Sequence, residues 1–407
     1  MRKNKLIVIG GGAAGFFCAV NAARLNPELE VIILEKTNKL LSKVKVSGGG
    51  RCNTTHACFE IPELVKKYPR GAVFLKKAFH HFYTNDTINW FAERGVALHA
   101  EPDGRMFPVT NQSQTIIDCL LKEADKYNVV VKTQCEVKRI EVVNNQFTLT
   151  TTASTMQAKF LCVACGGFPK SEMFEWLRST GHLIQSPVPS LFTFNIPNNS
   201  ISKLMGLSVS NAVVKVVGTK LKEKGPLLIT HWGLSGPVVL KLSAWGARDL
   251  AAVNYQFDIL VNWLGELTEA DLRADWTGYR ENYNAQKIAN RNPFGLPSRL
   301  WEFFLSQSEI DTTTRWAELK SKEQNKLIQL LTAYPFKVNG KTTFKEEFVT
   351  CGGVMLNEID PQTMESKKIP HLFFAGEVMD VDGITGGFNF QHAWTSGWIA
   401  ANTIAAK

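Results

Sequence analysis

A glycine-rich turn near the N-terminus constrains the fold of this chain more than any other feature. The sequence GGGAAG at residues 10–15 follows an apolar run at residues 6–9 and opens a helical pattern over residues 16–25. A second apolar run occupies residues 31–34. A strand, a tight turn, a helix and a second strand in about 30 residues form the unit from which parallel sheets are built. The N-terminal region therefore predicts an α/β fold.

The spacing Gly10-x-Gly12-x-x-Gly15 is the fingerprint of a dinucleotide-binding turn. The first glycine permits the tight turn, the second lets a pyrophosphate approach the backbone, and the third permits close packing of helix on strand. Glu35 follows twenty residues after Gly15, where a carboxylate accepts hydrogen bonds from ribose hydroxyls and repels a 2′-phosphate. A turn of purely structural origin is the alternative. The predicted dinucleotide site also includes Ala13, Ala14 and Lys36.

The composition is that of a folded globular chain with an excess of positive charge. The 407 residues are 44% hydrophobic and 20% charged, and the formal net charge of +9 suggests an anionic partner. No apolar run reaches the roughly 18 to 20 residues of a membrane span, and glycines interrupt the signal-like N-terminus. The eight cysteines suggest no disulfide framework, and the lone CxxC of Cys162 and Cys165 lies in an apolar run. These features predict a cytoplasmic protein without a metal site.

The order of the patterns predicts one domain that is interrupted by an insertion. Residues 129–132, 136–143 and 146–152 alternate apolar and polar residues and are predicted to form a small meander. Strand patterns with turn residues follow, then a helical pattern with three tryptophans, and the chain ends in a glycine-rich segment and a helix. The predicted parts are a nucleotide-binding domain at 1–189 and 350–407, a β-rich insert at 190–265 with a return segment at 335–349, and a helical insert at 266–334.

A second glycine-rich segment, SGGGRCN at residues 47–53, is preceded by Lys43 and Lys45. Three consecutive glycines allow a ligand to approach the backbone closely, and Arg51 adds a fixed positive charge. A flexible surface loop is the alternative. The flanking arginine, cysteine and asparagine favour a binding site, although the spacing alone does not name the ligand.

A third segment, residues 375–391, contains Gly376, Glu377, Gly386 and Gly387. It follows an apolar run that predicts a strand and precedes the last helical pattern of the chain. A helix N-terminus aimed at a cofactor stabilises negative charge that develops on it, as a reduced flavin requires. The segment therefore predicts a second helix N-terminus at a cofactor site.

With these segments the chain resembles a bacterial family of FAD-dependent, NAD(P)H-linked oxidoreductases typed by a hypothetical flavoprotein of Haemophilus. The resemblance runs the length of the chain, and Phe348 and Phe388 are small departures from it. It implies a Rossmann-like two-dinucleotide-binding-domain flavoprotein fold with an inserted β-barrel-like domain and a helical subdomain. The matching stretches are SGGGRCN (47–53), GRMFP (104–108), ACGG (164–167), THWGLSGP (230–237), VTCGGV (349–354) and AGEVMDVDGITGGFNFQHAWTSG (375–397).

The resemblance implies that FAD binds in an extended pose and that NAD(P)H visits transiently as electron donor. Gly10, Gly12 and Gly15 would hold the pyrophosphate, Glu35 the adenosine ribose, and Val137 the adenine through its backbone. The residues that would border the flavin ring are Lys43, Ser47, Gly48, Gly49, Gly50, Arg51, Cys52 and Asn53. Gly376 and Glu377 would meet the ribityl–phosphate part, and Gly166 also belongs to the cofactor site. The residues that would meet the pyrimidine edge of the isoalloxazine are Gly386, Gly387, Asn389 and Gln391.

Competing interpretations remain for the side chains that take part in the chemistry. A flavin that delivers hydride to an activated C=C bond requires a general acid for the neighbouring carbon. The first hypothesis is Cys52, with Arg51 lowering the pKa of its thiol or orienting it, against a cysteine that only packs beside the flavin. His231 would face the substrate or be a core or capping histidine. Arg105 would bind an anionic or carbonyl group of the substrate or be a surface arginine.

Positive charge is concentrated between residues 36 and 81, where ten Lys and Arg accompany two Glu. Such a cluster is typical of a phosphate-rich partner, although neutralisation of the FAD pyrophosphate or a solvated surface would also explain it. Of the family's activities (reduction of bile acid derivatives, oxidation of an aminoketone, and reduction of uridine in large-subunit ribosomal RNA), the cluster favours the last. The predicted function is reduction of an activated C=C bond by an FAD enzyme with NAD(P)H. The alternatives are a small-molecule enone reductase or aminoacetone-type amine oxidase, and a non-catalytic flavin-bearing RNA-binding factor.

Overall fold

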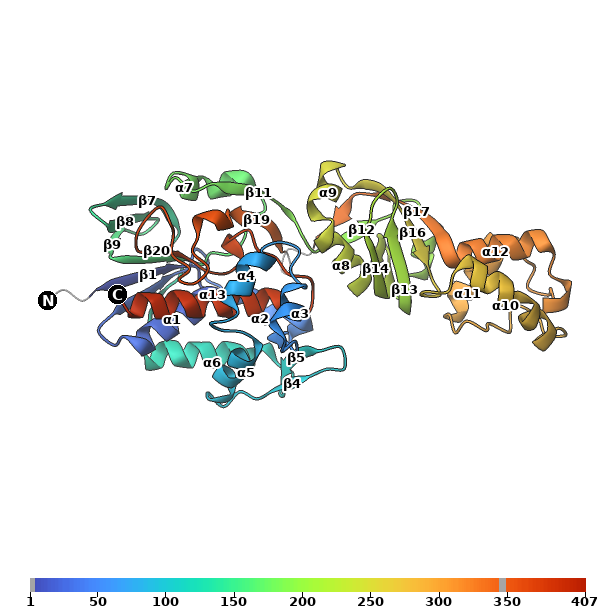
Figure 1. Cartoon of the computed structure of the whole chain (residues 1–407), viewed down its shortest axis with the longest axis horizontal. Coiled ribbons are helices and arrows are strands. Elements are labelled where there is room, and N and C mark those ends of the chain that lie inside the picture. The colour runs from blue at the N-terminus through green and yellow to red at the C-terminus, as the bar shows by residue number, and fades with distance from the viewer. Residues whose placement is uncertain (1–3, 344–348) are drawn as a thin grey trace. The chain divides into compact units, whose positions relative to one another are not determined.

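The computed structural model of the chain describes residues 4–343 and 349–407 and divides into two compact units. Unit 1 comprises Met1–Ser190 and Phe344–Lys407, and unit 2 is the intervening Leu191–Thr343. Figure 1 labels many of the helices and strands and colours the chain by residue number. Phe348 and the end of the predicted return segment at 335–349 lie outside the described residues.

Unit 1 is built on a five-stranded parallel sheet, which confirms the predicted α/β class. The strands lie in the order β20-β10-β1-β2-β6, and every neighbouring pair is parallel. The central strands are almost entirely buried, as is usual for a parallel sheet covered on both faces. The strand bounds are β1 Lys5–Ile9, β2 Glu30–Leu34, β6 Val130–Lys132, β10 Phe160–Val163 and β20 Leu372–Phe374.

Two long helices pack against each other on one face of this sheet. Helix α1 (Ala13–Leu25) contacts β1, β2 and β10, and helix α13 (Phe388–Ala405) packs along α1 (Figure 1). Their close approach depends on Gly397, because a Cβ added there would lie 2.8 Å from the carbonyl oxygen of Ala14. The two glycine-rich segments at the ends of the chain are thereby brought to neighbouring helices.

A three-stranded antiparallel meander contacts the parallel sheet from the other face (Figure 1). Its strands are β7 Val137–Val143, β8 Gln146–Thr151 and β9 Thr155–Ala158. The sequence prediction for this region was wrong in one respect, because residues 130–132 join the parallel sheet as β6 and β9 completes the meander instead. The periodicity of three residues is too short to decide to which sheet a strand belongs.

The remaining elements of unit 1 connect the sheet to its glycine-rich turns. Strands β3, β5 and β4 form a small antiparallel sheet, and β11 pairs with β19 where the chain leaves unit 1 and returns. The bounds are α2 Ser42–Gly50, β3 Thr55–His56, α3 Ile61–Val65, α4 Ala72–Ala78, α5 Thr84–Ala92, β4 Leu98–Ala100, β5 Arg105–Pro108, α6 Ser113–Lys126, α7 Glu175–Arg178, β11 Ile184–Pro189 and β19 Thr350–Val354, with the 3-10 helices η1 Ser171–Phe174, η4 Leu356–Glu358 and η5 Gly376–Val378.

Unit 2 contains an antiparallel sheet in the order β17-β16-β13-β14-β15-β12-β18. The two edge strands, β17 and β18, are consecutive in the chain and separated only by Gly340. The sheet must therefore curl to bring its edges together, which makes it barrel-like, as the resemblance implied. The bounds are β12 Thr193–Asn195, β13 Ser208–Val216, β14 Lys222–Thr230, β15 Gly233–Ser235, β16 Gln256–Asn262, β17 Tyr334–Asn339 and β18 Lys341–Thr342.

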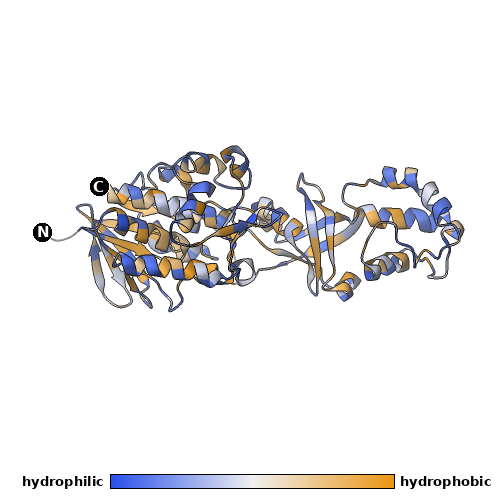
Figure 2. Ribbon diagram, turned by 90° about the horizontal axis from the view of Figure 1, so that it is seen from below, coloured by the Kyte–Doolittle hydropathy of each residue, from blue (hydrophilic) through white to orange (hydrophobic). Residues whose placement is uncertain are grey.

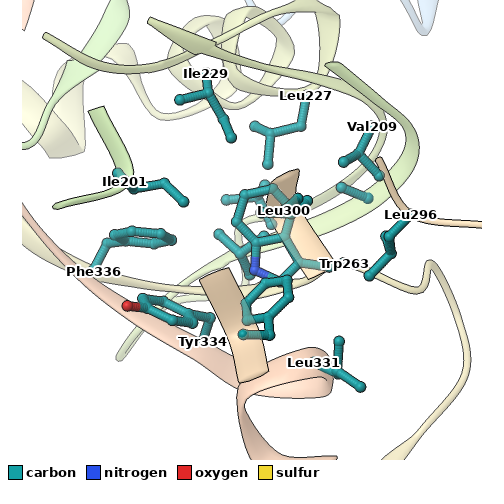
Figure 3. Close-up of a cluster of buried hydrophobic side chains, with 14 of the residues drawn as sticks. Ile201, Val209, Leu227, Ile229, Trp263, Leu296, Leu300, Leu331, Tyr334 and Phe336 are labelled. Carbon is teal, nitrogen blue, oxygen red and sulfur yellow. The ribbon is translucent and has the colours of Figure 1, made fainter. Parts of the chain in front are cut away.

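One hydrophobic core joins this sheet to the helices of unit 2. Trp263 lies among Leu300, Leu331 and Phe336 (Figure 3), and the same buried cluster continues to Trp316. Hydrophilic and hydrophobic residues alternate around the helices, as expected for helices with one buried face (Figure 2). The helix bounds are η2 Ser200–Leu204, α8 Pro237–Trp245, α9 Ala247–Ala252, α10 Glu269–Asn282, α11 Ser298–Gln307, η3 Trp316–Glu318 and α12 Ser321–Ala333.

Candidate functional site

In the turn between β1 and α1, two positions have no room for a side chain and therefore require glycine. Gly10 has a φ of +114°, and a Cβ added there would lie 2.4 Å from the carbonyl oxygen of Ala164. A Cβ on Gly15 would lie 2.0 Å from the carbonyl oxygen of Gly10. Gly12 differs, because nothing lies within 4 Å of an added Cβ. Packing therefore requires Gly10 and Gly15, whereas Gly12 borders open space.

The N-terminus of α1 is open to an anion. Its N-cap is Gly12, which offers no side chain to the first turn, and no acidic residue lies in that turn. Within the helix the amide of Phe16 donates to Gly12 O at 3.0 Å, so the amides of Ala13, Ala14 and Gly15 precede the first helical hydrogen bond. Free amides and the positive end of the helix dipole together favour a phosphate group.

Glu35 is fixed beside this turn by hydrogen bonds to both carboxylate oxygens. Its Oε2 accepts from the amide of Gly11 at 2.9 Å, and its Oε1 accepts from the amide and the hydroxyl of Thr37. The backbone of Glu35 also accepts a hydrogen bond from the amide of Cys135, two residues before Val137. The chain just before β7 is thereby held next to Glu35.

The residues after β2 and β10 lie at the same edge of the sheet as this turn. Lys36 is exposed, with its Nζ 5.3 Å from the centre of the Phe168 ring. Gly166 has a φ of +77°, and nothing lies within 4 Å of an added Cβ. In open α/β sheets, ligands bind outside the carboxyl ends of the strands. Lys36 and Gly166 are therefore placed on the ligand side of the sheet.

Segment 47–53 leaves helical geometry and exposes its backbone. Ser47 has non-helical dihedral angles at the end of α2, and Gly48, Gly49 and Gly50 all have a positive φ. A Cβ on Gly48 would lie 2.8 Å from the Phe107 ring, whereas nothing lies within 4 Å of a Cβ on either of the next two glycines. The segment is an ordered turn with open space beside two of its glycines.

Two arginines share one carboxylate near this turn. Arg51 Nη1 lies 2.6 Å from Glu101 Oε1, and Arg105 Nη2 lies 2.8 Å from Glu101 Oε2. Arg105 also pairs with Asp103 at 2.7 Å, and the guanidinium of Arg51 stacks 4.0 Å from the centre of the Phe107 ring. Both side chains are partly exposed, so each holds a fixed positive charge at the surface of the site.

Cys52 is fully buried between the glycines and β3. Its backbone has a φ of +62°, and its Sγ accepts a hydrogen bond from the hydroxyl of Thr54 at 3.7 Å. Burial raises the pKa of the Cys52 thiol to about 11, against smaller lowering effects from Thr54 and Ser47. The suggestion that Arg51 lowers the pKa of this thiol finds no support, because Arg51 pairs with Glu101. Burial favours the interpretation that Cys52 packs beside the site.

The N-terminus of α13 meets segment 47–53 directly. Asn53, with its amide oriented to satisfy both neighbours, accepts from the amide of Gly387 at 3.0 Å and donates to Thr55 O at 3.0 Å. Gly387 has a φ of +94°, and an added Cβ would lie 2.4 Å from Thr55 O. Gly386, with a φ of +132°, precedes it. Two glycine-rich segments from opposite ends of the chain thus form one site.

The side chain of Gln391 lies inside the protein rather than at the surface of the site. Its Oε1 accepts from the hydroxyls of Thr55 at 2.6 Å and Thr87 at 3.0 Å, and its Nε2 donates to the hydroxyl of Thr395 at 3.1 Å. The residue is completely buried. The side-chain amide of Gln391 thus holds α13 against its neighbours, and a contact of this residue with the isoalloxazine stays a prediction.

Asn389 also bonds within the protein. Its Oδ1 accepts from the amide of Gly383 at 2.8 Å, and its Nδ2 donates to the carbonyl oxygen of the same residue at 2.9 Å. This pair of bonds braces the loop that leads into α13. The side chain therefore supports the loop that leads into α13.

Gly376 is anchored to α13 through both its amide and its carbonyl group. The amide donates to Ser396 Oγ at 2.8 Å, and the carbonyl oxygen accepts from His392 Nε2 at 3.1 Å. A Cβ on Gly376 would lie 2.8 Å from the Cβ of Ala14. Burial lowers the pKa of His392 to about 4, so this histidine is neutral. The sequence analysis did not predict this role of His392, because no sequence signal distinguishes it from the other buried positions of α13.

Glu377 bonds to two segments of unit 1. Its Oε1 accepts from the amide of Thr350 at 2.8 Å, and its Oε2 lies 2.5 Å from Lys43 Nζ. Lys43 is 45% exposed as a side chain and Glu377 only 17%, so the carboxylate is the more buried partner. Both residues were predicted to lie at the cofactor site. The structure shows that they form an ion pair with each other.

A buried ion pair between Arg70 and Asp382 escaped the sequence analysis. Arg70 Nε donates to Asp382 Oδ1 at 2.6 Å, its Nη2 reaches the other carboxylate oxygen, and the hydroxyl of Ser190 donates to the same oxygen. Asp382 is completely buried, and burial raises the pKa of its carboxyl group, an effect that Arg70 opposes. The partners are 312 residues apart, so only the fold reveals the pair.

His231 belongs to unit 2 and is exposed. With Trp232 it forms the two-residue turn between β14 and β15, and the two ring centres lie 4.1 Å apart. The alternative of a core histidine is therefore wrong. The glycine-rich segments all belong to unit 1, so the role of His231 towards the substrate stays a prediction.

Within residues 4–343 and 349–407, no helix is long and apolar enough to cross a membrane, and no cluster of His, Cys, Asp or Glu is arranged to bind a metal ion. The parallel sheet, the open N-terminus of α1 and the glycine turn before α13 define a dinucleotide-binding domain of Rossmann type. The family and relatives that it matches make the chain an FAD-dependent oxidoreductase. The chain matches the HI0933-like protein Rossmann domain over residues 4–403 and belongs to that family.

Two curated relatives and one solved structure illustrate the likeness. A ribosomal RNA dihydrouridine synthase of Escherichia coli (strain K12) is 31% identical to this chain, and the match covers 100% of both proteins. A 3-dehydro-bile acid delta(4,6)-reductase of Clostridium scindens is 25% identical over 99% of this chain and 100% of the relative. The structure of 3-ketosteroid-delta4-(5alpha)-dehydrogenase from Rhodococcus jostii RHA1 matches with a TM-score of 0.52 and 13% identity, over 99% of this chain and 97% of that chain, which is a likeness of fold.

Proposed function

We propose that this protein is a cytoplasmic FAD enzyme that uses NAD(P)H to reduce a uridine in large-subunit ribosomal RNA to dihydrouridine. The observation that carries the proposal is the full-length match, at 31% identity, to a protein named ribosomal RNA dihydrouridine synthase. Unit 1 is the FAD-binding domain in this proposal, with boundaries near residues 189 and 350. Unit 2 is the insertion into this domain.

The residues of unit 1 are suited to hold FAD. Gly12, Gly49 and Gly50 all border open space, and the first turns of α1 and α13 carry no acidic residue that would repel a phosphate or a reduced flavin. When bound, FAD supplies hydride transfer between the nicotinamide and the substrate. The amides at the start of α1 bind the pyrophosphate, and Glu35 accepts hydrogen bonds from the ribose hydroxyls. The N-terminus of α13 stabilises negative charge near its backbone amides.

The two arginines are the groups that we propose for substrate binding. Arg51 and Arg105 both pair with Glu101, which fixes their direction while leaving donors of each guanidinium exposed. They would bind a carbonyl oxygen or phosphate of the substrate. We propose that Cys52 packs behind the site, because a thiol with no exposed surface and a pKa raised to about 11 is poorly placed to exchange protons with a ligand.

The basic residues of segment 36–81 that form no ion pair support an RNA partner. Four of the basic residues, Lys43, Arg51, Lys66 and Arg70, pair with carboxylates. In the part of the chain that the structure describes, the other six basic residues form no ion pair, and five of these six are exposed. We propose that they contact phosphates of the RNA. The six residues are Lys36, Lys39, Lys45, Lys67, Lys76 and Lys77.

A second candidate is a small-molecule enone reductase. The bile acid reductase of Clostridium scindens is 25% identical over almost the whole chain, so the same fold also accompanies reduction of a small apolar substrate. The charge of segment 36–81 favours the RNA substrate over this alternative. An aminoacetone-type oxidase and a non-catalytic RNA-binding factor remain outcomes that the following experiment separates.

The test is nucleoside mass spectrometry of ribosomal RNA from a strain that lacks the gene. We expect one dihydrouridine to disappear and to return in full when the wild-type gene is restored, but to return less fully when a Gly12→Ala variant with weakened FAD binding replaces it. In parallel, the purified protein is assayed for NADH and NADPH oxidation with RNA, with enones and with small amines. An unchanged nucleoside profile together with turnover of an enone would overturn the RNA proposal in favour of the small-molecule reductase.

A further inference from the structure

The hairpin β13–β14 of unit 2 carries three lysines close together in the chain. Lys215 lies on β13 directly opposite Lys222 on β14, and Lys220 lies in the turn that joins the two strands. All three side chains are exposed. We call them the hairpin lysines. None forms an ion pair within the residues that the structure describes.

The acidic residues around the hairpin lysines have other neighbours. Glu266 lies 3.2 Å from Lys224, and Asp258 on β16 is directly opposite Lys337 on β17. On its other side Lys215 faces Leu260 of β16, which is uncharged. Glu223 is next in sequence to Lys222, and its side chain is turned to the opposite face of the sheet because successive strand residues alternate.

A like-charge pair directly across two strands destabilises the sheet. Opposite residues in an antiparallel pair have Cβ atoms about 4.5–5.5 Å apart, a distance at which two ammonium groups repel one another. The surrounding segment increases the effect, because residues 191–265 contain seven Lys and Arg and only three Asp and Glu. A solvated surface does not require such a pair, whereas a surface that binds an anion gains from it.

We propose that the hairpin lysines bind the phosphate backbone of the RNA, as a second contact surface besides segment 36–81. The inference rests on the proposed function, which makes RNA the anionic partner. Lysine ammonium groups are point charges on flexible stems, so they suit contacts to phosphates better than readout of bases. The two strands and their turn offer these charges on one surface of unit 2. Binding there would add affinity without dependence on sequence.

The test compares two triple variants that lose the same charge. The hairpin variant is Lys215→Gln, Lys220→Gln, Lys222→Gln, and the control variant is Lys287→Gln, Lys320→Gln, Lys322→Gln, which removes exposed lysines elsewhere in unit 2. Each FAD-loaded protein is titrated with purified large-subunit ribosomal RNA from the deletion strain at several salt concentrations. Each phosphate contact contributes about 0.7 to 0.9 to the slope of log K against log salt.

We expect the hairpin variant to bind the RNA about tenfold more weakly at low salt, with a slope reduced by about 2 to 3, and the control to stay within about twofold of the wild type. Oxidation of NAD(P)H with a small acceptor should be unchanged in both. The unfolding temperature of the hairpin variant should be equal or higher, since repulsion is removed, whereas a structural role would lower it. The single variant Lys222→Gln provides a milder form of the same test.

Equal RNA binding by the hairpin and control variants would overturn the inference while leaving the proposed function intact. Absence of salt-dependent RNA binding by the wild type would overturn both. Vesicles that contain an anionic phospholipid serve as a further probe. If the hairpin variant loses binding to these vesicles but not to the RNA, the surface binds lipid headgroups and the RNA inference is wrong.

Discussion

The N-termini of α1 and α13 look alike in sequence and differ in how they are built. Both follow a strand of the parallel sheet and begin at a glycine without a side-chain cap of its own. The first helical hydrogen bond of α1 is local, from the amide of Phe16 to the carbonyl oxygen of Gly12, and Gly12 borders open space. The start of α13 depends on distant residues, because Asn53 accepts from the amide of Gly387 and Thr55 bonds to Gln391. The first turn is a local structure, and the second is assembled by the fold.

Gly15→Ala should have the largest effect, because the α1 turn has no room at this position. The added Cβ would lie 2.0 Å from a backbone oxygen that cannot move away, so we expect a loss of about 3 kcal/mol or more in the free energy of unfolding. Denaturant unfolding of the purified protein measures it. A loss below about 1 kcal/mol would show that the turn is adaptable and would weaken the contrast with α13.

Gln391→Leu tests the long-range bonds that build the start of α13. Two threonine hydroxyls lose a buried acceptor, and we expect a loss of about 3 kcal/mol in the free energy of unfolding. The control is Gln114→Leu, at an exposed position of α6. If stability stays the same and only FAD affinity falls, Gln391 contacts the cofactor, and the start of α13 does not depend on its long-range hydrogen bonds.

His392 makes the anchor between α13 and Gly376 sensitive to acid. Burial lowers its pKa to about 4 in the folded protein, below the usual value near 6.5, so the unfolded chain binds the proton more readily. The stability it contributes is present above about pH 6.5 and is lost as the pH falls towards 4, by about 2 kcal/mol between pH 7 and pH 5. Urea unfolding measures the free energy of unfolding at pH 7 and at pH 5. The loss of stability between the two pH values should be smaller for His392→Gln than for the wild type, and the same as in the wild type for the exposed His80→Gln.

Gly12→Ala should have the smallest effect on the fold and a selective effect on the cofactor. Nothing lies within 4 Å of the new Cβ, so the unfolding free energy of the FAD-free protein should change by less than about 1 kcal/mol. The methyl group would occupy the space proposed for the pyrophosphate, and we expect FAD to bind about tenfold more weakly, or about 1.4 kcal/mol. Flavin fluorescence titration measures the affinity. Unchanged affinity would mean that the pyrophosphate lies elsewhere.

The contrast between the two helix starts also explains what the sequence could predict. The β1–α1–β2 unit was predicted because its glycines, Glu35 and apolar runs lie within one stretch of chain and obey local rules. Segment 130–132 was assigned to the wrong sheet, since three residues carry too little pattern. The internal role of Gln391 and the pairing of Arg70 with Asp382 depend on residues 304 to 336 positions apart, which no local pattern encodes.

Antiparallel pairing of β11 with β19 has a consequence for the architecture of the gene. Pro189, the last residue of β11, is paired with Thr350, the first residue of β19, so the outgoing and returning chain ends of unit 1 lie side by side. A short turn would suffice to connect them. Unit 1 could thus be expressed as one continuous chain with the intervening residues replaced by that turn.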